Sequence, residues 1–228
     1  MNDINIQSKI RSLCKKISLK YEKKLYTNYV CDRKAIIIDN YLSGCPDQLY
    51  SKHKNNTSEN KERHLQKFIL SKEFKEEMKK PRGAKTNGKD SIWKMNILRK
   101  SKIDEKMLKK MKIFYKKVKK LDNGFGVSIV DHKTFKEKEV ILHEYIHILL
   151  DSNKIRPASW KWNEGLTTYL TSYILNREKI HKNKPKKEKF KSAFMYAYYA
   201  YAHKWYNLLH KENQPEKKLN IIKIKSLK

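Results

Sequence analysis

Two histidines and a glutamate interrupt an apolar run in "ILHEYIHILL", residues 141–150. His143 and His147 are four residues apart, which places both side chains on the same face of a helix. Two imidazoles so placed can bind one divalent metal ion, and Glu144, about 100° further around the helix than His143, can reach a water on that ion. In this HExxH arrangement the glutamate can serve as a general base in hydrolysis.

The segments that flank this motif can hold it rigidly. "FGVSIVD", residues 125–131, has the alternation and β-branched content of a strand. Thr134 and Glu137 then have the spacing of a capping box, which predicts a helix from about Phe135 to about Leu150 that "DSN" ends. Without a metal, three polar groups among apolar neighbours would need several other hydrogen-bond partners.

A third metal ligand is available downstream, in "SWKWNEGLTTYLTSYIL", residues 159–175. Catalytic zinc sites use three protein ligands and a water. Glu164 opens a predicted amphipathic helix, and packing of that helix beside the first would turn the carboxylate toward the two histidines. The alternative for Glu164 is a surface carboxylate that the helix dipole favours.

The combination of "HEYIH" and "WNEGLTTYL" resembles the gluzincin metallopeptidases, especially their aminopeptidase N-like and peptidase MA-like branch, over roughly residues 125–210. The resemblance implies one zinc ion per chain, bound by His143, His147 and Glu164, with Glu144 activating the water. The chain departs from the family at two points. Sixteen residues separate His147 from Glu164, slightly fewer than in the best-known members, and Thr167 stands where alanine is frequent.

The same family has a tyrosine on a later helix, where its hydroxyl stabilises the oxyanion. Alignment on the apolar pattern of "WYNLL" points to Tyr199, with Ala202 in place of the family's glycine. Tyr196 and Tyr198 remain open as alternatives. The segment 195–211 also fits an ordinary apolar helix face.

The aminopeptidases of this family carry a G-x-M-E-N segment that holds the free amino terminus of the substrate. The segment "NGFGVSIVD" that precedes His143 has no carboxylate at that position, which favours an endopeptidase. The predicted strand at 125–131 would then pair with an extended peptide or protein substrate through its backbone.

The net charge of +30, from 54 basic and 24 acidic residues, attracts polyanions. Lysine supplies 47 of the 54, whereas base readout and bidentate phosphate contacts favour arginine. The charge therefore indicates at most a weak association with nucleic acid or another polyanion. The charge suggests one alternative to a general endopeptidase, a protease acting on nucleic-acid-associated proteins. A second alternative is a latent zinc-binding protein without catalysis, whose site the long N-terminal segment before the motif would close.

A hydrophobic fraction of 39% can build a core, and the expected fold is α+β and predominantly helical. We expect a zincin-like catalytic domain with a small twisted sheet, an active-site helix and a helical lower half. A basic, mainly helical N-terminal region at 1–90 precedes this domain at 91–228, with "PRGAKTNGKDS" as the linker. Apolar periodicity predicts helices near 4–25, 65–74 and 101–121, and "AIII" at 35–38 predicts a short strand.

No window of 18 apolar residues occurs, and the N-terminus lacks the apolar core of a signal peptide, which favours a cytoplasmic protein. Cys14, Cys31 and Cys45 form no CxxC pair. We expect them to be buried or incidental thiols.

Overall fold

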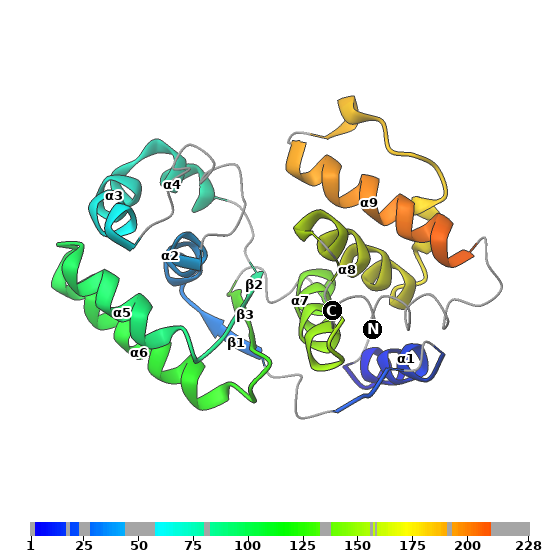
Figure 1. Ribbon diagram of the computed structural model, residues 1–228, viewed down its shortest axis with the longest axis horizontal. Helices are drawn as coiled ribbons and strands as arrows, with labels where there is room; N and C mark the ends of the chain where they lie inside the picture. The colour runs from blue at the N-terminus through cyan, green and yellow to red at the C-terminus, as the bar shows by residue number, and fades with distance from the viewer. Residues whose placement is uncertain are drawn as a thin grey trace. The chain divides into compact units, whose positions relative to one another are not determined.

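The computed structural model describes residues 3–16, 19–22, 28–43, 58–79, 83–132, 138–155, 157, 159–190 and 193–210. The strands are β1 (Asn28–Cys31), β2 (Gly83–Thr86) and β3 (Val127–Asp131). The remaining regular elements are helical: α1 (Asp3–Lys16), α2 (Arg33–Ser43), α3 (Ser58–Leu70), α4 (Lys72–Glu77), α5 (Ser91–Lys100), α6 (Glu105–Leu121), α7 (Lys138–Ser152), α8 (Trp160–Ile174), α9 (Ala193–His210), and the 3-10 helices η3 (Glu178–His181) and η4 (Lys187–Lys189). The predicted class, α+β and mainly helical, is confirmed (Figure 1).

The three strands form one small mixed sheet in the order β1–β3–β2. β3 pairs in parallel with β1 and antiparallel with β2, so that Ile129 faces both Tyr29 and Ala84. The predicted strand at 125–131 is confirmed over 127–131, but it is the central strand. Because both its edges are already paired, the prediction that it pairs with a peptide is wrong. Among the described strands, β1 and β2 form the outer edges of the sheet.

The chain divides into two compact units, one of residues Lys24–Glu144 and one of Met1–Lys23 with Tyr145–Lys228. The division falls inside α7, which runs as one continuous helix. The segment 81–91, predicted as a linker, contains β2 instead. The domain limits 1–90 and 91–228 stay a prediction.

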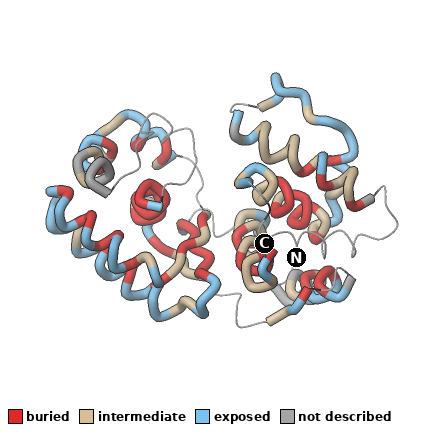
Figure 2. The backbone as a smooth tube through the Cα atoms, viewed as in Figure 1, coloured by how far each residue is buried: buried red, intermediate tan, exposed pale blue. Residues whose placement is uncertain are grey.

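Helix α2 is the central element of the unit 24–144. Every residue from Ala35 to Leu42 is buried, and α2 packs against β2, β3 and α6 (Figure 2). The prediction of a strand at 35–38 is therefore wrong. A helix that is buried on all sides has no polar face, and a short apolar run then looks the same as that of a buried strand.

A buried ion pair joins α2 to its neighbouring helices. Lys94 of α5 donates to Asp39 of α2 at 2.7 Å and to the Ser43 hydroxyl at 2.7 Å. Tyr115 of α6 donates to the same Asp39 oxygen at 2.8 Å. Lys94 is 1% exposed and Asp39 is fully buried, and burial together with the nearby Asp39 charge raises the pKa of Tyr115. The two buried charges thus stabilise each other, and the Ser43 and Tyr115 hydroxyls add one hydrogen bond to each.

The bounds of the other predicted helices differ from the observed ones, in two cases because a capping residue starts a helix. The predicted helix at 101–121 begins at Glu105, where Asp104 accepts a hydrogen bond from the Met107 amide at 2.8 Å. The helix near 65–74 is two helices, since the Ser71 hydroxyl accepts from the Phe74 amide at 3.1 Å and starts α4. The helix at 4–25 ends at Lys16.

In the second unit α8 packs against α1, α9 and η3. Aromatic rings fill the contact between α8 and α9: Trp162 lies edge-on to Tyr201 and to Trp205, at centroid distances of 5.1 and 5.4 Å. The Trp205 indole donates a hydrogen bond to the Trp162 carbonyl at 2.8 Å. This contact holds the N-terminal part of α8, where Glu164 follows Trp162 by two residues.

None of the described helices is long and apolar enough to cross a lipid bilayer. Cys14 and Cys31 are buried free thiols, as predicted, and burial raises their pKa values to about 11 and about 12. Cys45 lies outside the described residues.

Candidate metal centre

The two histidines and the glutamate singled out in the sequence come together. His143 and His147 of α7 and Glu164 of α8 each offer one ligand atom, and these atoms all lie within 4.8 Å of one another. His147 Nε2 is 3.3 Å from Glu164 Oε2. Within the described part of the chain, no other group of three His, Cys, Asp or Glu side chains meets this criterion. The three side chains can hold a metal ion.

Helix α7 presents the histidines because its apolar residues face the interior. Leu142, Ile146 and Leu149 are buried, whereas His143 and His147 are only partly so. The helix ends at Ser152, and Lys154 follows in the left-handed region with φ 57°. The predicted end is thus confirmed to within two residues. The capping box at 134 and 137 lies outside the described residues.

The second ring nitrogen of His147 is held by Thr167. The Thr167 hydroxyl is 3.2 Å from His147 Nδ1 and donates to the Asn163 carbonyl at 3.0 Å. Because the Thr167 hydroxyl donates its proton in the hydrogen bond to that carbonyl, its oxygen accepts a hydrogen bond from Nδ1–H of His147. We therefore assign the tautomer in which Nε2 is unprotonated. Metal-binding histidines are usually oriented by such a bond from their other nitrogen.

Glycine at position 165, next to Glu164, allows α9 to pack closely against α8. A Cβ there would overlap the Tyr201 side chain and lie 2.7 Å from the Tyr201 carbonyl carbon and 3.0 Å from the Ala202 amide. Gly165 and Ala202 are both buried. The close approach of α9 therefore depends on the glycine that follows Glu164.

Glu144 faces the start of strand β2. Its side chain is 8% exposed, and a Cβ at Gly83 would lie 3.5 Å from Glu144 Oε1 and 2.5 Å from Val140 Cγ1. Only a glycine leaves room here for the strand to pass α7. Sequence reasoning missed Gly83, since a glycine within a polar stretch looks like part of a loop.

The tyrosines of α9 lie among other aromatic rings. Tyr199 packs against Phe190 and His181, at centroid distances of 5.2 and 5.6 Å. Tyr196 is 6.0 Å from Phe190, and Tyr198 is 6.5 Å from Trp160, one turn before Glu164. The assignment of an oxyanion donor to Tyr199 stays a prediction.

A second histidine cluster lies between α8, η3 and α9 and was not identified from the sequence. His181, 1% exposed, is 2.8 Å from the Ser172 hydroxyl, and its carbonyl is 2.8 Å from His203 Nδ1. The Asn207 side-chain nitrogen, Nδ2, lies 3.0 Å from His203 Nε2 and ends this series of hydrogen bonds. Burial lowers the pKa of His181 to about 4, so this imidazole is neutral and fastens η3 to the two helices.

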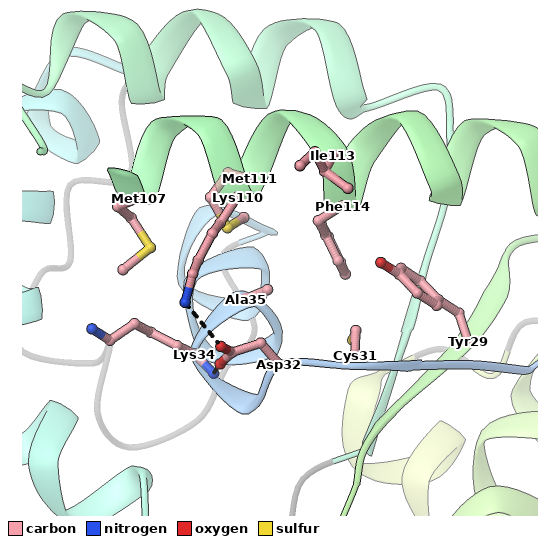
Figure 3. A pocket seen from close by; sticks show the side chains of 10 residues that line it. All are labelled: Tyr29, Cys31, Asp32, Lys34, Ala35, Met107, Lys110, Met111, Ile113 and Phe114. Atoms are coloured by element: carbon pink, nitrogen blue, oxygen red, sulfur yellow. Dashed lines mark hydrogen bonds and ion pairs between the residues drawn. The ribbon is translucent and has the colours of Figure 1, made fainter. Parts of the chain in front are cut away.

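A separate cavity of about 200 Å³ lies between α6 and the start of α2 (Figure 3). Its walls are mainly apolar, with Met111 and Phe114 on one side and Ala35 on the other. At its rim Lys110 is 3.5 Å from Asp32. Its one carboxylate is thus paired, so the cavity lacks the set of convergent ligands that defines the metal centre.

No protein-family model, curated protein or solved structure matches the chain. The geometry of the His–His–Glu group therefore carries the functional assignment. Fold and site together describe a mainly helical α+β protein with a candidate metal-binding triad.

Proposed function

We propose that the chain is a zinc metallopeptidase of the gluzincin type that cleaves internal peptide bonds. The observation that supports this most strongly is the convergence of His143, His147 and Glu164 within 4.8 Å, with Glu144 next to the first histidine on α7. The i, i+4 spacing aligns the two histidines on α7, whereas Glu164 comes from another helix, and its sequence separation from His147 does not by itself require the two to meet in space.

The donor set suits zinc. Two imidazole nitrogens and one carboxylate oxygen form a set found in catalytic zinc sites, which leave one position for water. The tautomer assigned to His147 turns the Nε2 lone pair toward the Glu164 carboxylate at 3.3 Å. Two acceptors this close repel each other unless a cation or a proton lies between them. A metal ion satisfies both.

A bound zinc ion would supply Lewis-acid polarisation of the scissile carbonyl and a lower pKa for a water. Glu144 is the base of this scheme: it takes the proton of the attacking water and passes it to the leaving amine. Its neighbour Gly83 adds no side chain of its own beside the carboxylate. Thr167 keeps His147 in its metal-binding orientation.

Strand β2 is the element best placed to bind the substrate backbone. It is an edge strand of the sheet, and Gly83 at its start lies against Glu144. In this proposal an extended peptide pairs with the outer edge of β2, the strand whose first residue lies against the general base. Gly83→Ala should therefore lower peptide cleavage and leave zinc affinity unchanged, because the added Cβ meets Val140 and Glu144 but none of the ligands. Loss of zinc in this variant would contradict this arrangement.

The proposal is tested by incubating the zinc-loaded protein with a degenerate peptide library. General-base catalysis contributes about 10²–10⁴ in rate, so Glu144→Gln should abolish detectable cleavage while retaining zinc. Glu139→Gln, an exposed change on the same helix, is the matched control and should cleave as wild type does. A wild type that binds zinc and cleaves nothing would leave the latent zinc-binding protein as the correct assignment.

A further inference from the structure

The exposed side of α6 carries a dense positive charge. This helix has eight lysines and one glutamate among its 17 residues, and all eight lysines are exposed. Its other side is buried through Met107, Met111, Phe114, Tyr115 and Val118. The charge is therefore displayed outward from a helix that the protein core holds in place.

Six of these lysines form a narrow band. At 100° per residue they fall within an arc of about 120°, which also contains the exposed Ile113. We call this band the lysine row; its members are Lys106, Lys109, Lys110, Lys116, Lys117 and Lys120. From first to last it extends about 21 Å at 1.5 Å per residue.

Of three acidic groups next to α6, two have partners outside the lysine row and one pairs with a member of it. Asp104 caps the helix, and the Asp122 carboxylate accepts hydrogen bonds from the Gly124 and Gly126 amides at 2.8 and 3.0 Å. Asp32 pairs with Lys110 at 3.5 Å (Figure 3). Among the described residues, this is the one ion pair made by a member of the lysine row.

We propose that the lysine row binds the phosphate backbone of a nucleic-acid duplex without reading its sequence. A duplex strand has one phosphate per about 3.4 Å of axis, so the row spans about six phosphates. Lysine is a point-charge partner for phosphate, whereas bidentate base contacts favour arginine, and α6 has none. The contact therefore positions the protein on the duplex and carries no sequence preference.

The composition of the exposed side argues against two other polyanions. Single-stranded nucleic acid is bound by aromatic platforms, and the two aromatic residues of α6, Phe114 and Tyr115, are buried. A helix that lies in a membrane surface inserts an apolar face, but here that face is occupied by the protein core. Ile113 alone remains exposed among the lysines, at 65%.

The test compares two full-length variants with equal loss of charge. The first replaces Lys109, Lys116, Lys117 and Lys120 by Gln, which keeps helix propensity and spares the Lys110–Asp32 pair. The second, the matched control, makes the same change at four exposed lysines of the η3–η4 segment: Lys179, Lys182, Lys184 and Lys187. Circular dichroism and thermal unfolding verify that both variants fold like wild type.

Binding is measured by fluorescence anisotropy with labelled 20-base-pair duplexes of two unrelated sequences, between 50 and 200 mM salt. Wild type should bind both duplexes equally. The first variant should lower the slope of log K against log salt by about 3–4, since each lost phosphate contact removes about 0.9, and weaken binding more than tenfold at 100 mM salt. The control should stay within twofold of wild type.

Equal weakening in both variants would show that charge acts diffusely and would overturn the assignment to α6. Tighter binding of a single strand than of a duplex, or of anionic vesicles that duplex cannot displace, would overturn the choice of partner. If the fourfold variant does not fold, Lys116→Gln and Lys120→Gln singly should each reduce the slope by about 0.9. None of these outcomes depends on the metal centre.

Discussion

The hydrogen bond from Thr167 to His147 gives a sharp prediction for metal affinity. Thr167→Val keeps the shape of this fully buried side chain but removes the hydroxyl that lies 3.2 Å from His147 Nδ1. His147 then loses the group that fixes its ring orientation and directs Nε2 toward Glu164. Thr167 is in this sense a positioning residue and touches neither metal nor substrate.

The size of the effect follows from the type of contact. Loss of a partner that orients a metal-bound histidine costs about 10- to 100-fold in metal affinity, which corresponds to about 1.4–2.7 kcal/mol. Thr167→Ser retains the oxygen and should bind zinc close to wild type. Thr168→Val is the matched control, because the Thr168 hydroxyl has no hydrogen-bond partner among the described residues.

The assay is competition for zinc with a chromophoric chelator at neutral pH, on all three variants and wild type. Peptide cleavage at saturating zinc provides a second readout. Because excess zinc offsets a lower affinity, the cleavage rate of Thr167→Val should be much closer to wild type than its zinc affinity is. Zinc affinity in Thr167→Val within twofold of wild type, or an equal loss in Thr168→Val, would refute the role assigned to Thr167.

Three further predictions concern stability, measured by urea unfolding. Asp39→Ala should destabilise the fold by about 3–5 kcal/mol, because Lys94 is left buried without its partner, and adding Lys94→Met should restore much of the loss. Gly165→Ala should cost about 1–3 kcal/mol through overlap with Tyr201 and should also weaken zinc binding. As pH falls from about 6.5 to about 4, the unfolded chain protonates His181 and the folded protein does not, so stability should drop by about 1.4 kcal/mol per pH unit, in total about 3 kcal/mol. This part of the pH dependence should vanish in His181→Gln; a variant with the wild-type profile would contradict the buried neutral imidazole.

The candidate metal ligands could be predicted from sequence because their chemistry is local. The spacing of His143 and His147 within one helix is enough to align them, and the "NEG" segment identifies Glu164 as their partner. The structure brings these three residues together as predicted. The end of α7 and strand β3 were predictable for the same reason, since turn signals and β-branched alternation are short-range features.

The rest of the site depends on which elements pack together, and no local pattern encodes that. Gly83 lies in a polar stretch, and its role follows only from the pairing of β2 with β3 and the approach to Glu144. Thr167 reaches His147 through the register of α8 against α7. The buried helix α2 shows the same limit, because its apolar sequence is set by burial on all sides.

The most direct test of the metal centre is the zinc content and affinity of the purified protein beside Glu164→Gln. Glu188→Gln, an exposed change elsewhere in the same unit, serves as the matched control. One zinc ion per chain in wild type and in the control, with a large loss of affinity in Glu164→Gln, is the predicted result. A wild type that binds no zinc, or a Glu164→Gln protein that binds it undiminished, would contradict the assignment of His143, His147 and Glu164 as a zinc site.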